Sequence, residues 1–226
     1  MTNNLIKTFL LILTLTPLMK SSDFAIELED LFDISKAIPD LNKSTFLDSL
    51  TPKTLVKTLG FGWNLGNTLD AFSTNENEGL ESEIAWGNPY TTEKMINALV
   101  AKGFKAIRIP VTWHNHLIDK NYTIDTIWMK RVKEIVDWCI NKNLYVILNT
   151  HHDNAEYREN VTIDYGEGYY PLKKDMEESE RFLYNIWKQI SFTFNNGYDH
   201  HLIFECMNEP RMRNLPNTLL IYIKIN

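Results

Sequence analysis

The sequence predicts a parallel α/β fold arranged as part of a barrel, and two observations support this. Short apolar segments alternate four times with segments of helical period, which is the pattern of a parallel sheet covered by helices. A barrel places its chemistry at the carboxyl ends of its strands, whereas a doubly wound sheet would carry a glycine-rich phosphate loop, which this sequence lacks. Polar or aromatic residues follow every apolar segment: Asn64 and Asn67, Arg108 and Trp113, His151 and His152, and Asn208 and Glu209.

Each expected element has a local reason. The apolar residues of the third helix recur every three or four positions, and Thr91 or Thr92 can cap the second helix, which Gly103 would end. The third strand is almost continuously apolar, as expected when both faces of a parallel sheet are buried. The expected helix and strand pairs lie at 45–58 and 61–65, 91–103 and 106–111, 128–139 and 144–148, and 176–196 and 202–207.

Composition excludes several classes of function. The 226 residues are 44% hydrophobic, which is enough for a core, and the net charge of −6 argues against binding nucleic acid through its phosphates. Cys139 and Cys206 fall on different expected elements, so we expect two free buried thiols rather than a disulfide framework or a zinc site. Beyond the N-terminus no apolar stretch reaches the roughly 18 residues that a membrane span needs.

The N-terminus predicts a secreted, extracellular protein. Residues 1–22 have the pattern of a signal peptide, with Lys7 in a short polar region before an apolar run that begins at Phe9. The cleavage point is not defined by a clear small-residue site. The alternative is an N-terminus that frays or tethers the chain to a membrane; after removal of a signal, we expect no membrane partner.

Four motifs in chain order make the sequence recognisable. They are Gly62–Asp70, Arg108–Trp113, Asn149–Asp153 and Ile203–Pro210. Together they closely resemble glycoside hydrolase family 5, especially its bacterial and anaerobic-fungal endoglucanases, over residues from about 50 to 211. One such motif alone would be weak, but four in order, each at an expected strand end, are specific.

The resemblance implies a retaining β-glycanase on a (β/α)8 TIM barrel. By that resemblance Glu209 matches the general acid/base, Asn208 the side chain that binds the sugar 2-hydroxyl, and Arg108 the arginine that keeps the nucleophilic carboxylate ionised. His151 and His152 match the paired histidines of the cleft floor. The substrate-binding candidates are Asn67, Asp70, Trp86 and Trp113, of which either tryptophan could stack on a pyranose ring.

Physical chemistry is consistent with these assignments and leaves other interpretations open. An arginine inside an apolar strand is costly unless it meets a carboxylate, whose pKa it lowers. A lone buried arginine more often forms a structural ion pair, but the three neighbouring motifs favour a role in the site for Arg108. Adjacent histidines at a strand end should point apart, so we expect no metal, and we expect no cofactor. Glu205 should lie deeper in the barrel as a structural residue. The remaining expectations are loop or surface positions for His114 and His116, and packing roles for Trp128, Trp138 and Trp187.

The length matches only the N-terminal half of a barrel. Four β/α units end at Glu209, whereas a complete barrel needs about 250 residues. In this family the nucleophile lies on the seventh strand, and it is absent from this chain; Asp70, Asp153 and Glu156 are nearby in sequence but do not match it. We therefore expect a partial catalytic domain over 45–211, truncated after its fourth strand, and an atypical tail over 212–226.

The predicted function is that of a retaining endo-β-1,4-glucanase that hydrolyses β-glucan polysaccharide, in a truncated and catalytically incomplete form. One alternative is a hemicellulase of the same family, acting on xyloglucan, mannan or xylan. Another is a non-catalytic carbohydrate-binding remnant or an unstable product, since an open half-barrel exposes strand edges. A half-barrel that becomes complete by dimerisation is possible but not expected.

Overall fold

The computed structural model describes residues 51–72, 79–154 and 166–210. All of them belong to one unit of the chain, Lys43–Asn226. The predicted signal peptide, the first part of the 45–58 helix, Glu156 and the 212–226 tail lie outside the described residues. In the part that is described, no helix has the length and apolar character needed to cross a membrane.

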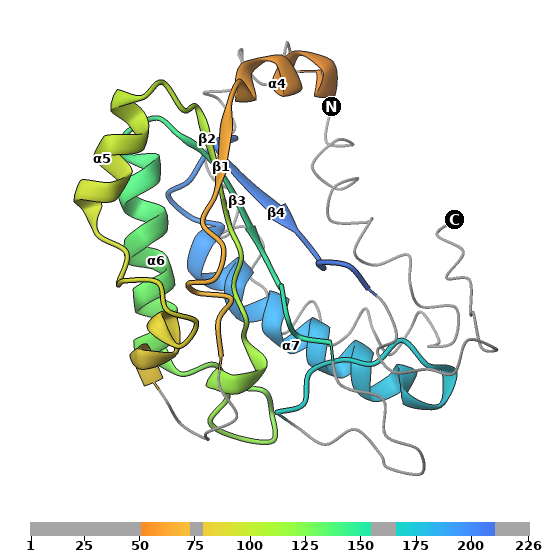
Figure 1. Cartoon of the computed structure of the whole chain (residues 1–226). Helices are drawn as coiled ribbons and strands as arrows, with labels where there is room; N and C mark the ends of the chain where they lie inside the picture. Colours follow the sequence, from red (N-terminus) through yellow and green to blue (C-terminus); the bar gives the residue numbers. More distant parts are fainter. Residues whose placement is uncertain (1–50, 73–78, 155–165, 211–226) are drawn as a thin grey trace, which may run out of the picture. The chain divides into compact units, whose positions relative to one another are not determined.

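Helices and strands alternate along the chain as predicted (Figure 1). The helix expected over 45–58 is described only from Pro52, and the other expected elements are found with their bounds shifted by a few residues. The main elements are α4 Pro52–Leu59, β1 Gly62–Asn64, α5 Glu93–Ala101, β2 Ala106–Ile109, α6 Thr126–Ile140, β3 Tyr145–Asn149, α7 Met176–Phe194 and β4 Leu202–Glu205. Three short 3₁₀ helices are η3 Gly79–Ile84, η4 His114–His116 and η5 Lys173–Asp175.

The four strands form one parallel sheet in the order β1-β2-β3-β4. The register pairs Asn64 with Arg108, and Asn149 with Glu205. Because paired residues point to the same face of a sheet, these polar side chains share one face. This is the first half of the parallel barrel that the sequence predicts.

Local chemistry sets the ends of the helices. The Thr92 hydroxyl accepts a hydrogen bond from the Met95 backbone at the start of α5, and the Thr51 hydroxyl caps α4 in the same way, with Pro52 as its first residue. Helix α5 ends before Gly103, whose positive φ of 87° is easily adopted only by glycine. The predicted cap and stop of this helix are therefore confirmed.

The core lies between the sheet and the helices α5, α6 and α7, of which α5 and α6 pack side by side (Figure 1). Ile107 and Ile109 of β2 point into it from the sheet and are completely buried. The predicted inner face of α6 is confirmed: Trp128, Val132, Ile135 and Cys139 are all buried. The packing roles expected of Trp138 and Trp187 are also confirmed, since both contribute to this core.

Two expectations about burial are wrong. Cys206 is exposed, whereas Cys139 is buried. Cys206 directly follows β4, the last strand of the described sheet, so no further described strand covers it. His116 is buried instead of lying at the surface, because its ring stacks on Trp128 at 3.6 Å between centroids and its Nε2 lies 3.0 Å from the Ser82 hydroxyl.

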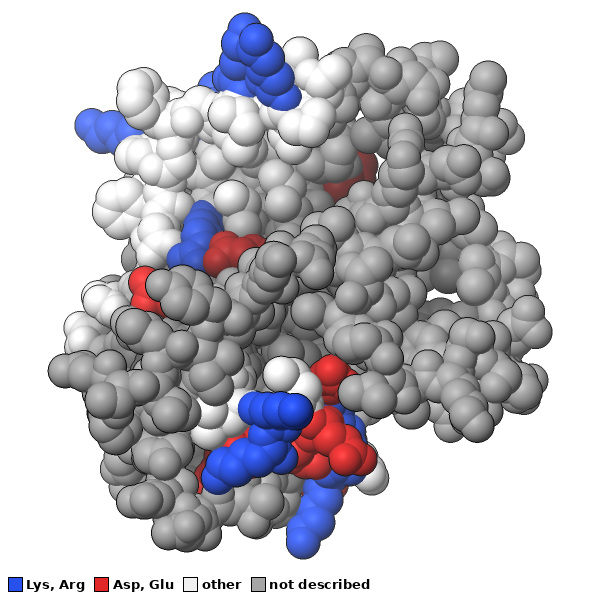
Figure 2. Space-filling view, turned by 90° about the vertical axis from the view of Figure 1, so that its right-hand side faces the viewer, with Lys and Arg blue, Asp and Glu red and all other residues white. Residues whose placement is uncertain are grey.

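Charges of both signs are mixed on the described surface. On the face shown in Figure 2, acidic and basic side chains lie next to each other near the middle and at the bottom, while the basic side chains at the top have no acidic neighbour in view. Nucleic-acid binding through phosphates needs a basic patch or stripe, and this part of the described surface offers none.

Candidate active site

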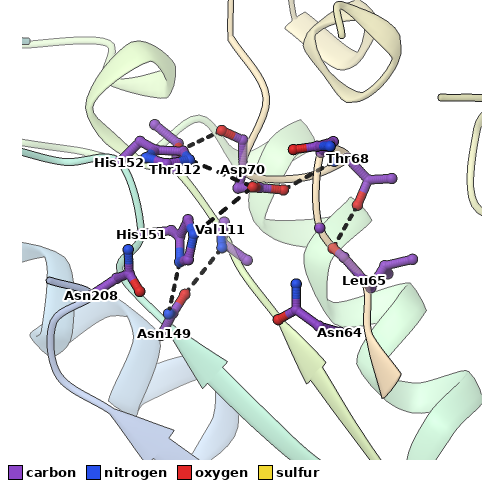
Figure 3. Close-up of polar contacts among 12 residues, drawn as sticks. Asn64, Leu65, Thr68, Asp70, Val111, Thr112, Asn149, His151, His152 and Asn208 are labelled. Atoms are coloured by element: carbon purple, nitrogen blue, oxygen red, sulfur yellow. Dashed lines mark hydrogen bonds and ion pairs between the residues drawn. The ribbon is translucent and has the colours of Figure 1, made fainter. Parts of the chain in front are cut away.

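The predicted site residues converge at the carboxyl ends of the four strands (Figure 3). Asn67 and Asp70 follow β1, His151 and His152 follow β3, and Asn208 follows β4. Because the strands are parallel and adjacent, residues far apart in sequence meet at this one edge.

Arg108 of β2 is the centre of a side-chain network. Its Nε donates to Glu205 Oε2 at 2.7 Å and its Nη2 to Glu205 Oε1 at 2.6 Å, a bidentate contact. Nη2 also donates to Asn208 Oδ1 at 2.9 Å, and Nη1 to Asn64 Oδ1 at 3.1 Å. The arginine therefore fixes the carboxylate of Glu205 and the amide of Asn208 together, immediately before Glu209.

Glu205 thus belongs to the network around Arg108, and the expectation that it lies deeper in the barrel as a structural residue stays a prediction. Its side chain is about one-third exposed, and the register of β3 and β4 sets it beside Asn149 on the polar face of the sheet. Burial raises the pKa of Glu205, but the hydrogen bonds from Arg108 and Asn149 and the charge of Arg108 together outweigh this, and the pKa is lowered. In turn the hydrogen bond to Glu205 raises the pKa of Arg108.

Asp70 lies opposite the two histidines. Its Oδ2 is 3.6 Å from His152 Nε2 and 3.9 Å from His151 Nε2, while Thr68 donates its backbone N–H to Oδ1 at 3.0 Å (Figure 3). Burial of Asp70 raises its pKa, but contacts with His152 and backbone N–H groups outweigh this and leave the pKa lowered. Asp70 is therefore the ionised acceptor of this part of the site.

The expectation that the adjacent histidines point apart is wrong. The rings of His151 and His152 lie edge to face with centroids 4.5 Å apart, because both turn toward the one Asp70 carboxylate. Asp70, His151 and His152 each offer one atom that could bind a metal ion, and these three atoms lie within 4.8 Å of one another. A second such group, Asp199 with His200 and His201, precedes β4 at the opposite edge of the sheet.

The two tryptophans expected to stack on a sugar differ in exposure to solvent. Trp86 is 42% exposed and is held in place by its Nε1 donating to the Phe72 carbonyl oxygen and by ring contact with His152. Trp113 is fully buried and donates its Nε1 to the Asn149 carbonyl oxygen at 3.0 Å. A sugar ring cannot reach Trp113, so its predicted substrate contact is wrong, whereas Trp86 presents an accessible ring.

Two candidate residues have unusual backbone conformations. Asn67 has φ of 59° and Glu209 has φ of 42°, in the left-handed region that non-glycine residues seldom occupy. The Asn67 carbonyl oxygen accepts from Asn88 Nδ2, and the Glu209 carbonyl oxygen accepts from Asn154 Nδ2. Such conformations cluster at functional sites, where the surrounding structure holds them.

Asp153, one of the carboxylates near the motifs in sequence, is bound to backbone groups of the protein. It is fully buried and its Oδ1 accepts hydrogen bonds from the backbone N–H groups of Trp113 and His114. His114 Nδ1 lies 3.2 Å from the same oxygen, so His114 lies in the loop after β2, as expected, with its side chain mostly covered. Asp153 therefore builds the loop after β2 and does not face a substrate.

Sequence reasoning missed one residue at the centre of this site. Asn149, the last residue of β3, is fully buried and hydrogen-bonds to Val111, His151 and Glu205. A polar residue that ends an otherwise apolar strand was the available signal. The same signal, applied to Glu205 at the end of β4, would have placed that residue in the site.

Comparison with known proteins identifies the class. The family model for cellulase (glycosyl hydrolase family 5) matches residues 66–222, and the chain belongs to this family. Endoglucanase B from Ruminococcus albus is 49% identical over 163 residues, which cover 71% of this chain and 36% of that enzyme.

Solved structures of the family resemble the chain in the same region. A broad-specificity endoglucanase from Clostridium longisporum is 44% identical with a TM-score of 0.63, covering 74% of this chain and 45% of that one. A family 5 enzyme from Prevotella bryantii, solved as a variant with a xyloglucan tetradecasaccharide, is 35% identical with a TM-score of 0.64 and covers 73% of this chain and 45% of that one. The chain thus spans less than half the length of these relatives and corresponds to a partial (β/α)8 barrel.

Proposed function

We propose that this chain carries the acid/base half of the active site of a retaining endo-β-1,4-glucanase that cleaves β-glucan. The observation that carries the proposal is the network in which Arg108 binds both Glu205 and Asn208, one residue before Glu209 at the carboxyl edge of the sheet. Family membership and the similarity to endoglucanases support the same reaction class.

In this proposal Glu209 donates a proton to the oxygen of the leaving sugar and then, as a base, activates the water that hydrolyses the glycosyl-enzyme. Asn208 accepts from Arg108 through its Oδ1, so its Nδ2 group is left to donate to the 2-hydroxyl of the sugar. Glu209 is exposed at the end of this network, where a polysaccharide chain can reach it.

The remaining candidates form the wall and floor of the cleft. Trp86 offers an exposed ring on which a pyranose can stack, and its neighbour His152 extends the same surface. Asp70 and His151 supply an acceptor and a donor for sugar hydroxyls beside it. Asn67, exposed on the loop after β1, extends the row of polar contacts.

A retaining mechanism also needs a nucleophilic carboxylate about 5–5.5 Å from the acid. Among the described residues the nearby carboxylates have other partners: Glu205 binds Arg108, Asp153 binds backbone N–H groups, and Asp70 faces two histidines. We therefore propose that the nucleophile comes from further barrel strands, and that this 226-residue chain alone does not hydrolyse β-glucan.

Location and substrate range are part of the proposal. A polysaccharide is too large to enter a cell, which supports the signal-peptide interpretation of residues 1–22 and an extracellular enzyme. Xyloglucan is the second candidate substrate, because it is the ligand in the similar Prevotella bryantii structure.

The test compares this chain with the same chain joined, after Pro210, to the second half of the Clostridium longisporum enzyme. We expect the extended protein to hydrolyse carboxymethyl-cellulose, with the β anomer as first product in proton NMR, and the original chain to show no activity. Activity on xyloglucan alone would move the substrate to the second candidate. Binding of cellulose without hydrolysis by a folded extended protein would contradict the proposal and favour a carbohydrate-binding remnant.

A further inference from the structure

The orientation of the Asn149 side-chain amide is fixed by its neighbours. The backbone N–H of Val111 can only donate, and it contacts Asn149 Oδ1 at 3.2 Å (Figure 3). The Nδ2 group therefore faces the other way, toward His151 Nδ1 at 3.1 Å and Glu205 Oε1 at 3.3 Å. The reversed amide would set its NH2 group against the Val111 N–H and its oxygen against a carboxylate, so two contacts exclude it.

The fixed amide determines where the hydrogen of the His151 ring lies. Because Asn149 Nδ2 is a donor, His151 Nδ1 must accept, and a neutral imidazole then carries its hydrogen on Nε2. That Nε2 faces Asp70 Oδ2 at 3.9 Å (Figure 3). The chain of contacts thus runs from the Val111 backbone through Asn149 and His151 to Asp70.

We propose that Asn149 is a positioning residue that holds His151 neutral, as the Nε2–H tautomer. Its consequence for catalysis rests on the proposed function, but the tautomer itself does not. Protonation of His151 would bring an Nδ1 hydrogen against the donor group of Asn149, so the amide disfavours the cation as well as the other neutral tautomer.

The charges around His151 leave the neutral form favoured. Asp70 and Glu205 face it as carboxylates, while Arg108 and the adjacent His152 oppose a positive charge on it. Burial, with the charge of His152 next, lowers the pKa of His151 to about 4. The geometry of the Asn149 amide acts in the same direction as these two causes.

The tautomer has a chemical consequence for the cleft. A metal ion needs the lone pair of a ring nitrogen, and with hydrogen on Nε2 the nitrogen facing Asp70 has none to give. The group of Asp70, His151 and His152 is therefore arranged as hydrogen-bond donors around one acceptor and not as a metal site. His151 can offer its N–H to a sugar hydroxyl that approaches from the side of the His151–Asp70 pair.

The same amide also reaches the acid/base side of the site. Asn149 Nδ2 contacts the Glu205 oxygen that accepts the 2.6 Å hydrogen bond from Arg108. One buried side chain thus fixes both the histidine donor and the carboxylate partner of the arginine. Its loss should disturb substrate contacts on two strands together.

The experiment is long-range nitrogen–proton NMR of the imidazole rings in the full chain at neutral pH, with His151→Gln to assign the resonances. We expect the pattern of an Nε2–H tautomer for His151. In Asn149→Asp the new carboxylate accepts from Nδ1, so we expect an Nδ1 hydrogen and a His151 pKa raised by about 1–3 units. Asn97→Asp, which adds the same charge at an exposed position of α5, should leave both unchanged.

A hydrogen on Nδ1 of His151 in the wild-type chain, or a pKa of 6.5 or above, would overturn the inference. The wild-type spectrum alone gives the tautomer of His151, so it tests the inference even where Asn149→Asp does not fold. No turnover is measured in this experiment, so a failed endoglucanase assay of the extended protein, together with an Nε2–H tautomer, would contradict only the proposed function. Turnover with an Nδ1–H tautomer would contradict only this inference.

Discussion

Two arginine–glutamate pairs in this chain have the same chemistry and different surroundings. Arg131 of α6 meets Glu83 of η3, with side chains 13% and 0% exposed, whereas Arg108 and Glu205 are 26% and 32% exposed. Arg131 also donates to the Thr91 carbonyl oxygen, and Glu83 accepts the Thr91 backbone N–H. The hydrogen bonds of Arg108 run to the side chains of Glu205, Asn208 and Asn64.

The partners distinguish the two roles. A pair that binds backbone groups of a loop holds the loop to a helix, so its loss should cost folding free energy. A pair that binds other side chains at an open edge fixes the positions of groups that meet a ligand, so its loss should cost function. Burial and the type of partner, rather than the ion pair itself, separate structure from site.

The largest effect should come from breaking the buried pair. Replacing Arg131 by Met leaves the Glu83 carboxylate buried without its cation, which costs about 3–5 kcal/mol of unfolding free energy. Arg108→Met should cost about 1 kcal/mol, because solvent reaches that pair. Urea unfolding of both variants measures this, and an equal loss would remove the distinction between the pairs.

A conservative change at Arg108 should affect activity more than stability. In the extended, catalytically complete protein, Arg108→Lys keeps the charge but loses the bidentate contact with Glu205 and the simultaneous hold on Asn208. Misplacing groups next to the reaction costs about 10²-fold in kcat. Unchanged kcat on carboxymethyl-cellulose, with folding checked by circular dichroism, would show that charge alone is sufficient.

The last effect is absent at neutral pH and develops in acid, in the buried region around η3. Burial, followed by the charge of His114, lowers the pKa of His116 from 6.5 to about 3. Below pH 6.5 His116 is therefore protonated in the unfolded chain but stays neutral in the folded chain. The free energy of unfolding falls as the pH drops from 6.5 toward 3.

His116→Phe keeps a ring on Trp128 but removes this proton, so stability should fall less steeply in acid, by about 1.4 kcal/mol per pH unit. Urea unfolding at several pH values between 4 and 7 measures the slope. Equal slopes for the two proteins would mean that His116 titrates normally in the folded chain.

The fold was largely predictable because its signals are local. Helical spacing gives the buried face of α6 at Trp128, Val132 and Ile135, and capping by Thr92 gives the start of α5. The motifs at the strand ends also predicted that Arg108 and Asn208 lie at one edge of the sheet, since parallel strands align their carboxyl ends.

The errors concern features that depend on how distant segments meet. Trp113 follows a strand and looks available to a sugar, but its Nε1 finds the Asn149 carbonyl oxygen and the ring is buried. His116 looks like a loop residue until Trp128, on the next helix, covers it. Neither contact has a pattern within its own segment, so no periodicity reports it.

The central claim, that Glu209 is the general acid and base, is tested most directly by Glu209→Gln in the extended protein with two substrates. A positioned acid contributes about 10²–10⁴-fold, so hydrolysis of carboxymethyl-cellulose should fall by that factor. Aryl β-glycosides with good leaving groups need less protonation, so formation of the glycosyl-enzyme from them should fall much less, while its later hydrolysis, which needs the same residue as base, slows. An equal loss of the first step for both substrates, or full activity of the variant, would contradict the assignment.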